Sequence, residues 1–182
     1  MIQRGDTIIE VILAVTIFSL VAVGALTLMN SGTSMSQRSL ETTLVRQQID
    51  TQAELLRFVS RSSVGTTWHD VKAKAKREPV SILDSATCQD WAGVSDAFAL
   101  AATTSSVSII ENTSISATPE TFARVSSATP PQSQGISVQL VRVGEPPTSR
   151  LYDAYIQACW NGPGSSRPMT LGTIVRIYDT AN

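Results

Sequence analysis

The sequence predicts an α+β protein in which a long N-terminal helix packs on a C-terminal antiparallel β-sheet. Three observations lead to this prediction. An uncharged apolar run covers residues 11–29, apolar residues recur every three or four positions over 45–59, and three strand-like segments follow residue 135. The first two patterns are typical of helices and the third of half-buried strands. The 182 residues carry a net charge of −1, which gives no overall field that would favour nucleic acid.

The apolar run over 11–29 is long enough to cross a membrane. At a rise of about 1.5 Å per residue it spans about 28 Å, close to the ~30 Å hydrocarbon core of a bilayer. One carboxylate, Glu10, comes immediately before this run. Such a side chain costs roughly 3 kcal/mol at mid-membrane and less near the interface. The functional interpretation of Glu10 is that it pairs with another charge, and the alternative is that it merely lies in the headgroup layer.

The charges that flank the run predict its orientation. Arg4 and the amino terminus precede it, and no strong basic cluster comes directly after Met29. This asymmetry favours an N-terminus inside the cell and a C-terminal part outside the cytoplasmic membrane. Two alternatives are an anchor that is never cleaved and a soluble secreted protein released by ordinary signal peptidase after Ala25.

The first sixty residues resemble the class III leader and N-terminal helix of type IV pilins and pseudopilins. The leader MIQRG ends in Gly5, Glu10 falls fifth after it, and IIEVILAVTIF is similar to the TLIEVLVALAIF-type run of that family. The resemblance implies that a prepilin peptidase cuts between Gly5 and Asp6. It also implies N-methylation of the new terminus at Asp6, although Phe or Met is usual there.

The same resemblance implies that Glu10 acts in assembly. In the family, the acid of an incoming subunit is thought to neutralise the N-terminal amine of its neighbour as the helices stack. Such a pair cancels two desolvation penalties and fixes the register of the helices. Here the amine would belong to Asp6, whose own carboxylate weakens the attraction. Thr27 stands where major pilins often carry a proline, which favours a minor subunit.

These patterns divide the chain into a leader (1–5), a transmembrane and assembly helix (6–30), an amphipathic helix outside the membrane (31–62) and a β-rich head (63–182). A hinge near residues 30–32, which would separate two helices, is the alternative for the helical part. The residues expected to face the sheet form one stripe, because they are spaced three or four apart. They are Val45, Ile49, Ala53, Leu56 and Val59.

The strands are expected mainly in the last third of the chain. Residues 136–140 and 152–160 alternate between apolar and polar, and 173–178 is rich in β-branched residues. Turn signals at 144–147 and 161–164 join these segments into an antiparallel meander. Weaker strand candidates are 80–83 and 107–110. The Ser/Thr/Pro-rich segment of about 101–135 is predicted to be a long loop.

The two cysteines, Cys88 and Cys159, lie in the part assigned to the outside, where thiols oxidise. A disulfide between them agrees with the resemblance, because pilin-like proteins often carry one in the C-terminal region. The alternative is two separate buried thiols.

No pattern in the sequence indicates an enzyme or a cofactor. His69 is the only histidine and has no ligands at metal-binding spacing, and there is neither a nucleophile elbow nor a phosphate loop. The tryptophans Trp68, Trp91 and Trp160 are interpreted as core or loop anchors. The one basic cluster is interpreted as a solvated surface rather than a DNA-binding patch. It consists of Lys72, Lys74, Lys76 and Arg77.

The sequence thus predicts a minor type IV pilin-like or pseudopilin-like subunit that sits in the cytoplasmic membrane and assembles by helix stacking into an external fibre. The expected partners are other such subunits, the prepilin peptidase, an assembly platform in the membrane and the lipid bilayer, with DNA as a weaker candidate. A hypothesis from another class is a membrane-tethered module that binds a ligand outside the cell and never polymerises.

Overall fold

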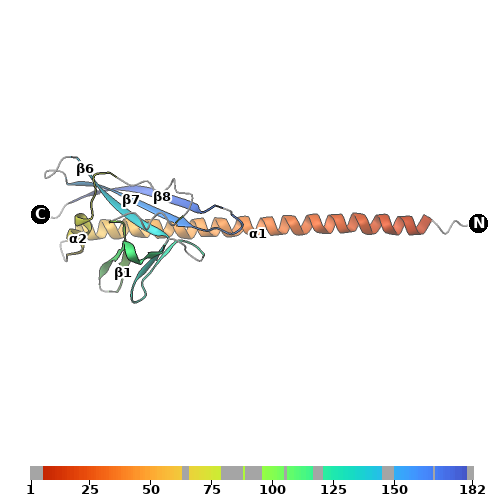
Figure 1. Ribbon diagram of the computed structural model, residues 1–182, viewed down its shortest axis with the longest axis horizontal. Helices are drawn as coiled ribbons and strands as arrows, with labels where there is room; N and C mark the ends of the chain where they lie inside the picture. Colours follow the sequence, from red (N-terminus) through yellow and green to blue (C-terminus); the bar gives the residue numbers. More distant parts are fainter. Residues whose placement is uncertain are drawn as a thin grey trace, which may run out of the picture. The chain divides into compact units, whose positions relative to one another are not determined.

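The computed structural model confirms the α+β fold, with a long N-terminal helix, α1 (Asp6–Arg61), and a C-terminal antiparallel sheet (Figure 1). The structure describes residues 6–62, 66–78, 88, 96–104, 106–116, 121–144, 150–165 and 167–179. The chain forms two compact units, the N-terminal unit Met1–Ser39 and the C-terminal unit Leu40–Asn182. Residues 30–32 are α-helical like their neighbours, so the secondary structure has no break at the hinge considered above.

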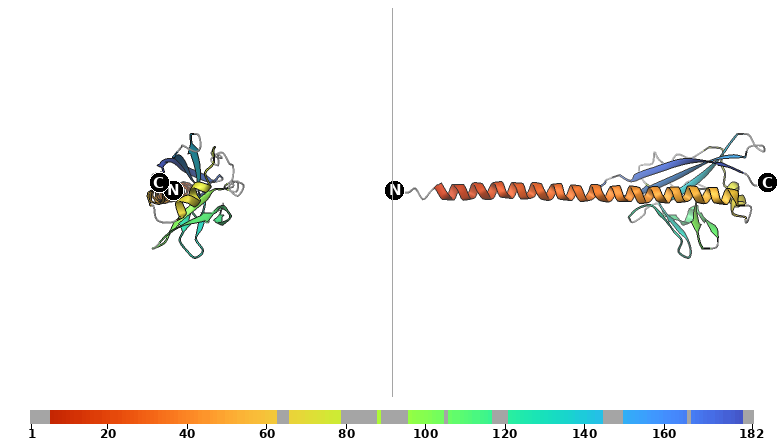
Figure 2. Two further views of the ribbon diagram at one scale, coloured as in Figure 1. Left: turned by 90° about the vertical axis from the view of Figure 1, so that its left-hand side faces the viewer. Right: turned by 180° about the vertical axis from the view of Figure 1, so that it is seen from behind.

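The elements of the C-terminal unit form two sheets (Figure 2). The main sheet has the strand order β2-β1-β6-β7-β8, and a small second sheet has the order β3-β5-β4. The elements after α1 are α2 (Thr67–Ala73), β1 (Phe98–Ala102), β2 (Val107–Glu111), β3 (Ile115–Ser116), β4 (Arg124–Ser126), β5 (Gln132–Gln134), β6 (Ile136–Val143), β7 (Leu151–Trp160) and β8 (Met169–Tyr178).

The predicted meander is confirmed as β6, β7 and β8, which pair antiparallel along their full lengths. Ile136 lies opposite Ala158 at one end of the first pairing. Leu151 lies opposite Tyr178 in the second. Because side chains alternate between the two faces of a strand, this register sends the even-numbered residues of β7 into the core.

The main core of the C-terminal unit lies between α1 and the inner face of the main sheet. All five residues of the predicted stripe on α1 are at most 5% exposed and belong to one cluster with residues of β6, β7 and β8. Trp160, at the end of β7, is buried in the same cluster, and its indole Nε1 donates to the Glu41 carboxylate on α1 at 3.1 Å. The predictions for the stripe and for this tryptophan are confirmed.

One polar residue is built into this packed face of the helix. Gln52 is 1% exposed, its amide Nε2 donates to the carbonyl of Leu100 in β1, and its Oε1 accepts from the Leu100 N–H, both at 2.8 Å. Within the described residues, β1 pairs with β6 only at Phe98 opposite Val138. The Gln52 side chain therefore bonds the β1 backbone as a neighbouring strand would, which avoids the cost of unpaired buried backbone groups.

The prediction of a long loop over about 101–135 is wrong, because β2, β3, β4 and β5 all begin and end within that segment. The weak candidate at 107–110 is confirmed as β2, and Ile110 is 2% exposed. The other three strands have at most three residues each, too few for an alternating pattern to stand out among serines and threonines. The candidate at 80–83 and Trp91 lie outside the described residues.

Replacing Leu56 with alanine tests the packing of α1 on the sheet. Leu56 is fully buried, so the truncation should lower the free energy of unfolding by about 2–5 kcal/mol. The measurement is urea denaturation of the full chain in detergent micelles, followed by tryptophan fluorescence. Phe58→Ala is the matched control, because Phe58 is 62% exposed two positions away and its loss should cost less than about 0.5 kcal/mol. Equal losses from the two substitutions would contradict this packing.

Candidate assembly site on the N-terminal helix

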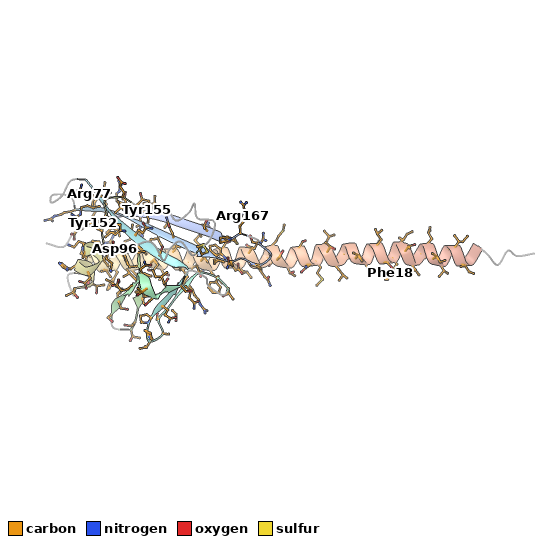
Figure 3. The ribbon with its side chains drawn as sticks, viewed as in Figure 1. Phe18, Arg77, Asp96, Tyr152, Tyr155 and Arg167 are labelled. Atoms are coloured by element: carbon orange, nitrogen blue, oxygen red, sulfur yellow. A yellow bond between two sulfur atoms is a disulfide. The ribbon has the colours of Figure 1, made fainter. Side chains whose placement is uncertain are left out.

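The part of α1 that lies in the N-terminal unit is apolar on most of its surface (Figure 3). None of its most apolar 18-residue stretch is buried within the protein. Phe18 and Leu28, for instance, are 74% and 75% exposed. Among the described residues, α1 is the one helix long and apolar enough to cross a membrane. The helix is thus compatible with a single-pass membrane anchor.

The hydroxyl groups within this apolar surface are satisfied by the helix itself. Thr16 Oγ1 and Ser19 Oγ donate to the carbonyls of Ile12 and Val15, each at 2.7 Å, and Thr27 Oγ1 donates to its own helix at 2.9 Å. An unpaired hydroxyl in hydrocarbon is costly, so these bonds to the preceding turn lower the cost of placing the segment in lipid. The serine and threonines in the run are therefore no obstacle to membrane insertion.

Of the site residues predicted at the start of the helix, two are part of α1 and one lies outside the described residues. Gly5 lies outside the described residues, and Asp6 is the first residue of α1. Glu10 is helical one turn later, with an exposed side chain, and residues 11–37 that follow carry no charge. Residues four apart share a helix face, so positions 6 and 10 lie on the same face of α1. The cleavage between Gly5 and Asp6 stays a prediction.

A second apolar surface on α1 was missed at the sequence level. Within the C-terminal unit, Leu40, Leu44 and Phe58 are 63%, 41% and 62% exposed. Their separations are close to whole numbers of turns at 3.6 residues per turn, so the three side chains share one face of the helix. That face points away from the stripe that packs on the sheet. We call it the outer stripe, and a helical-wheel plot of residues 40–58 would have revealed it.

The basic cluster after α1 is largely neutralised by acidic partners from other elements. Lys72 Nζ lies 2.8 Å from Asp179, whose second carboxylate oxygen accepts from the indole of Trp68. Lys74 and Lys76 lie 2.6 Å and 3.4 Å from the carboxylates of Glu111 and Asp96. The interpretation as a surface cluster is supported, because three of its four cations have partners within the protein and leave little charge for phosphate.

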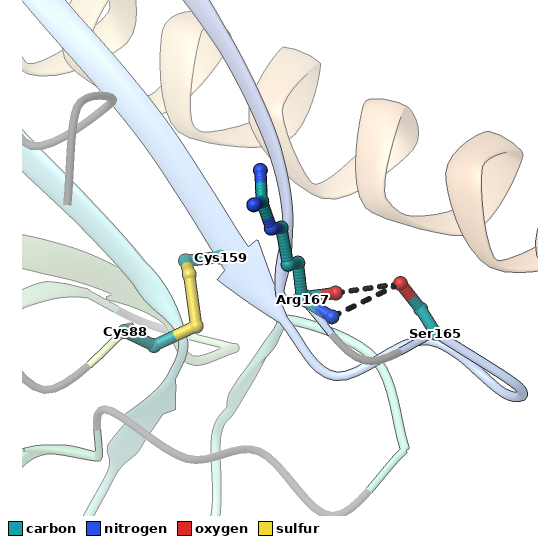
Figure 4. The surroundings of a disulfide bond; sticks show 4 residues. All are labelled: Cys88, Cys159, Ser165 and Arg167. Atoms are coloured by element: carbon teal, nitrogen blue, oxygen red, sulfur yellow. Dashed lines mark hydrogen bonds between the residues drawn. A yellow bond between two sulfur atoms is a disulfide. The ribbon is translucent and has the colours of Figure 1, made fainter. Parts of the chain in front are cut away.

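The predicted disulfide joins Cys88 to Cys159, next to the end of β7 (Figure 4). The two residues are 71 apart in sequence, both are at most 4% exposed, and the buried Ala97 packs beside them. The bond ties residue 88 to the main sheet, and the alternative of two separate thiols is excluded.

Within the described ranges, no group of three or more histidine, cysteine, aspartate or glutamate side chains is placed to hold a metal ion. The side chain of His69 is 84% exposed and lies 3.7 Å from Asp70 in α2. Trp68, beside it, is 4% exposed and contacts Tyr152 edge-on, so it anchors α2 on the core.

The outer face of β7 and β8 carries an ion pair that the sequence analysis also missed. Arg176 donates from Nε and Nη2 to the two carboxylate oxygens of Asp153, at 2.8 Å and 2.9 Å. These hydrogen bonds lower the pKa of the Asp153 carboxyl group below its ordinary value. The two residues lie opposite each other in the β7–β8 register, which sequence alone does not supply.

This pair predicts a pH dependence of stability. Because the pKa of Asp153 is lower in the folded chain than in the unfolded chain, the stabilisation is present above the unfolded value near 4 and is lost as the pH falls through the folded value. Asp153→Asn should therefore unfold at a lower urea concentration than the parent at pH 7. The difference between the two unfolding midpoints should narrow below about pH 4. Asp50→Asn is the control, because Asp50 is exposed and forms no ion pair among the described residues, and it should unfold at the same urea concentration as the parent at pH 7. A gap for Asp153→Asn that stays constant from pH 7 to pH 2 would contradict the assignment.

Comparison with known proteins gives no match: no protein-family model fits the chain, and neither a curated protein nor a solved structure is significantly similar to it. The architecture itself, a long apolar N-terminal helix on an antiparallel sheet, is a pilin-like arrangement.

Proposed function

We propose that this chain is a minor subunit of a type IV pilin-like or pseudopilin-like fibre. In this proposal a prepilin peptidase cleaves it between Gly5 and Asp6, the head lies outside the cytoplasmic membrane, and the subunits assemble through their N-terminal helices. The observation that carries the proposal is the register of Gly5 and Glu10 directly before an exposed apolar helix. The pilin-like fold of the rest of the chain supports it.

The proposed chemistry is the pairing of two charges that apolar surroundings otherwise penalise. Cleavage creates an amine on Asp6, and the Glu10 carboxylate of the incoming subunit approaches the amine of a neighbour. In the described part of the run that follows, residues 11–37 offer no other charge, so a misaligned helix leaves both groups unpaired. Breaking such a pair in apolar surroundings costs about 3–5 kcal/mol, which selects one register over its alternatives.

The outer stripe extends the proposed contact beyond the membrane segment. Leu40, Leu44 and Phe58 are exposed in the isolated chain, and burying one such side chain contributes about 1.5–3 kcal/mol. Stacked helices in a fibre would cover these residues against neighbouring subunits. The head would stay correctly folded in either state, because its core lies on the other side of α1.

The proposal is tested by shearing surface fibres from cells with and without the prepilin peptidase. We expect the chain in the sheared fraction only when the peptidase is present, and in the membrane fraction in both cases. Recovery in fibres from cells without the peptidase would contradict processing as the entry step, and absence from fibres in cells with the peptidase would contradict assembly.

Phe58→Asp tests the outer stripe. A carboxylate at this position should lower incorporation into fibres by about tenfold or more, because it replaces apolar contact with a charge that must be desolvated. Arg46→Asp places the same carboxylate at an exposed position of α1 off the stripe and should leave incorporation near normal. Thermal unfolding of both variants should match the parent, so equal incorporation of the two variants would remove the outer stripe from the proposal.

A further inference from the structure

The two edge strands of the main sheet, β2 and β8, differ in whether another element covers them. At the β2 edge, Thr67 of α2 donates to the carbonyl of Val107 at 3.3 Å, and Lys74 pairs with Glu111, so α2 covers part of that strand. At the other edge, β8 runs for ten residues without a proline or a lysine. In the part of the chain that the structure describes, no strand pairs with the outer side of β8. Long open edges of this kind are templates for an added strand.

The hydrogen-bond pattern identifies which backbone groups of β8 face outward. The N–H of Asp179 donates to the carbonyl of Arg150 at 2.9 Å, which continues the β7–β8 ladder by one residue. In an antiparallel pair the bonded residues alternate, so the odd-numbered residues of β8 bond β7. The even-numbered residues direct their N–H and C=O groups away from the sheet. They are Thr170, Gly172, Ile174, Arg176 and Tyr178.

An open groove of about 450 Å³ runs along this edge, between β8 and α1. From β8 it is lined by residues 173–176, and from α1 by Asp50, Ala53, Glu54 and Arg57. Among the described residues that α1 contributes to the groove, Ala53 is the uncharged one. A strand added at β8 would place alternate side chains into this groove, since successive side chains point to opposite faces of a sheet.

One carboxylate in the groove has no opposite charge paired with it among the described residues. Arg57 lies 2.5 Å from Glu54, and Arg176 is held by two hydrogen bonds to Asp153. Among the described residues Asp50 forms no ion pair, and its side chain is exposed. The groove therefore offers a negative charge beside backbone donors and acceptors of β8 that pair with no other strand among the described residues.

We propose that the β8 edge binds an extended segment of a partner protein, which adds to the main sheet as a further strand and carries a lysine or arginine opposite Asp50. Backbone hydrogen bonds to Ile174 and Arg176 supply the affinity, and the groove beside Ala53 selects the side chains. A second copy of β8 does not meet the charge requirement, because its one cation is already engaged by Asp153. The inference does not depend on assembly through Glu10.

The test measures binding of a blocked nonapeptide of alternating valine and threonine with a central lysine, titrated into the full chain in detergent micelles. We expect saturable binding that weakens at least tenfold when the central residue of the peptide is glutamate. Ile174→Pro should abolish binding, because it removes an outward N–H that β7 does not use, whereas Ile174→Val should bind as the parent does.

Asp50→Asn provides a second variant that does not alter a strand. It should bind the lysine and glutamate peptides with affinities within about threefold of each other, because the discriminating charge is gone. Three results would overturn the proposal: no saturable binding up to millimolar peptide, unchanged binding to a folded Ile174→Pro variant, or self-association of the parent chain that Ile174→Pro removes. The last would identify a second copy as the occupant of the edge.

Discussion

Replacing Glu10 with alanine is expected to remove the protein from sheared fibres and leave its level in the membrane unchanged. The substitution deletes the carboxylate that we propose to pair with the amine of a neighbouring subunit, while the apolar surface that follows it is intact. The unpaired amine then costs about 3–5 kcal/mol at each contact, which corresponds to a loss of more than a hundredfold in incorporation. The measurement is quantitative immunoblotting of the sheared and membrane fractions.

Two conservative variants separate charge from shape at this position. Glu10→Gln keeps the size of the side chain and, like Glu10→Ala, should not assemble. Glu10→Asp keeps the charge and should retain part of the incorporation into fibres. If Glu10→Ala enters fibres at the normal level, the pairing mechanism is wrong. If neither the parent nor the variant enters fibres, the membrane-tethered binding module becomes the better account.

Removing the disulfide is expected to lower the stability of the head about as much as truncating a buried core side chain does. A cross-link between residues 71 apart restricts the unfolded chain, and its loss in the Cys88→Ser, Cys159→Ser double variant should cost about 2–5 kcal/mol. The midpoint of urea unfolding should fall accordingly. The parent chain treated with a thiol reductant is the matched control and should unfold at the same urea concentration as the double variant. Equal midpoints for the oxidised parent and the double variant would contradict a structural role for the bond.

The parts of the fold that could be predicted are those with a repeated pattern. The buried stripe of α1 has five apolar residues at helical spacing, and β6 and β7 alternate over many residues. The periodic spacing of each element is therefore repeated often enough to be recognised in the sequence. Strong turn signals between the strands then leave an antiparallel meander as the simplest connection. The disulfide followed from compartment and from the presence of only two cysteines.

The parts that could not be predicted depend on tertiary contacts. Strands β3 and β5 have two and three residues, and their pairing is parallel, which no local turn specifies. Gln52 appears in sequence as a polar interruption, and its role follows only from the position of Leu100 in β1. The loop prediction failed for this reason: a composition rich in serine and threonine does not prevent short strands where neighbouring elements supply hydrogen bonds.

The features of the candidate site also divide into those that local sequence predicts and those that depend on tertiary contacts. Glu10 could be singled out because its register relative to Gly5 and to the apolar run is local information. The Asp153–Arg176 pair and the open edge of β8 could not, because each depends on the register or the order of strands within the sheet. The outer stripe lies between these cases, since its spacing is local but its exposure depends on which face of α1 packs on the sheet.

The measurement that tests the central claim most directly is the mass of the mature N-terminus, determined on protein from cells that contain the prepilin peptidase. We predict that the chain begins at Asp6, with or without a methyl group. A chain that begins at Met1 would be a plain anchor, and one that begins directly after Ala25 would be a secreted protein. Either of these results would contradict processing at Gly5 and leave Glu10 without a role in assembly.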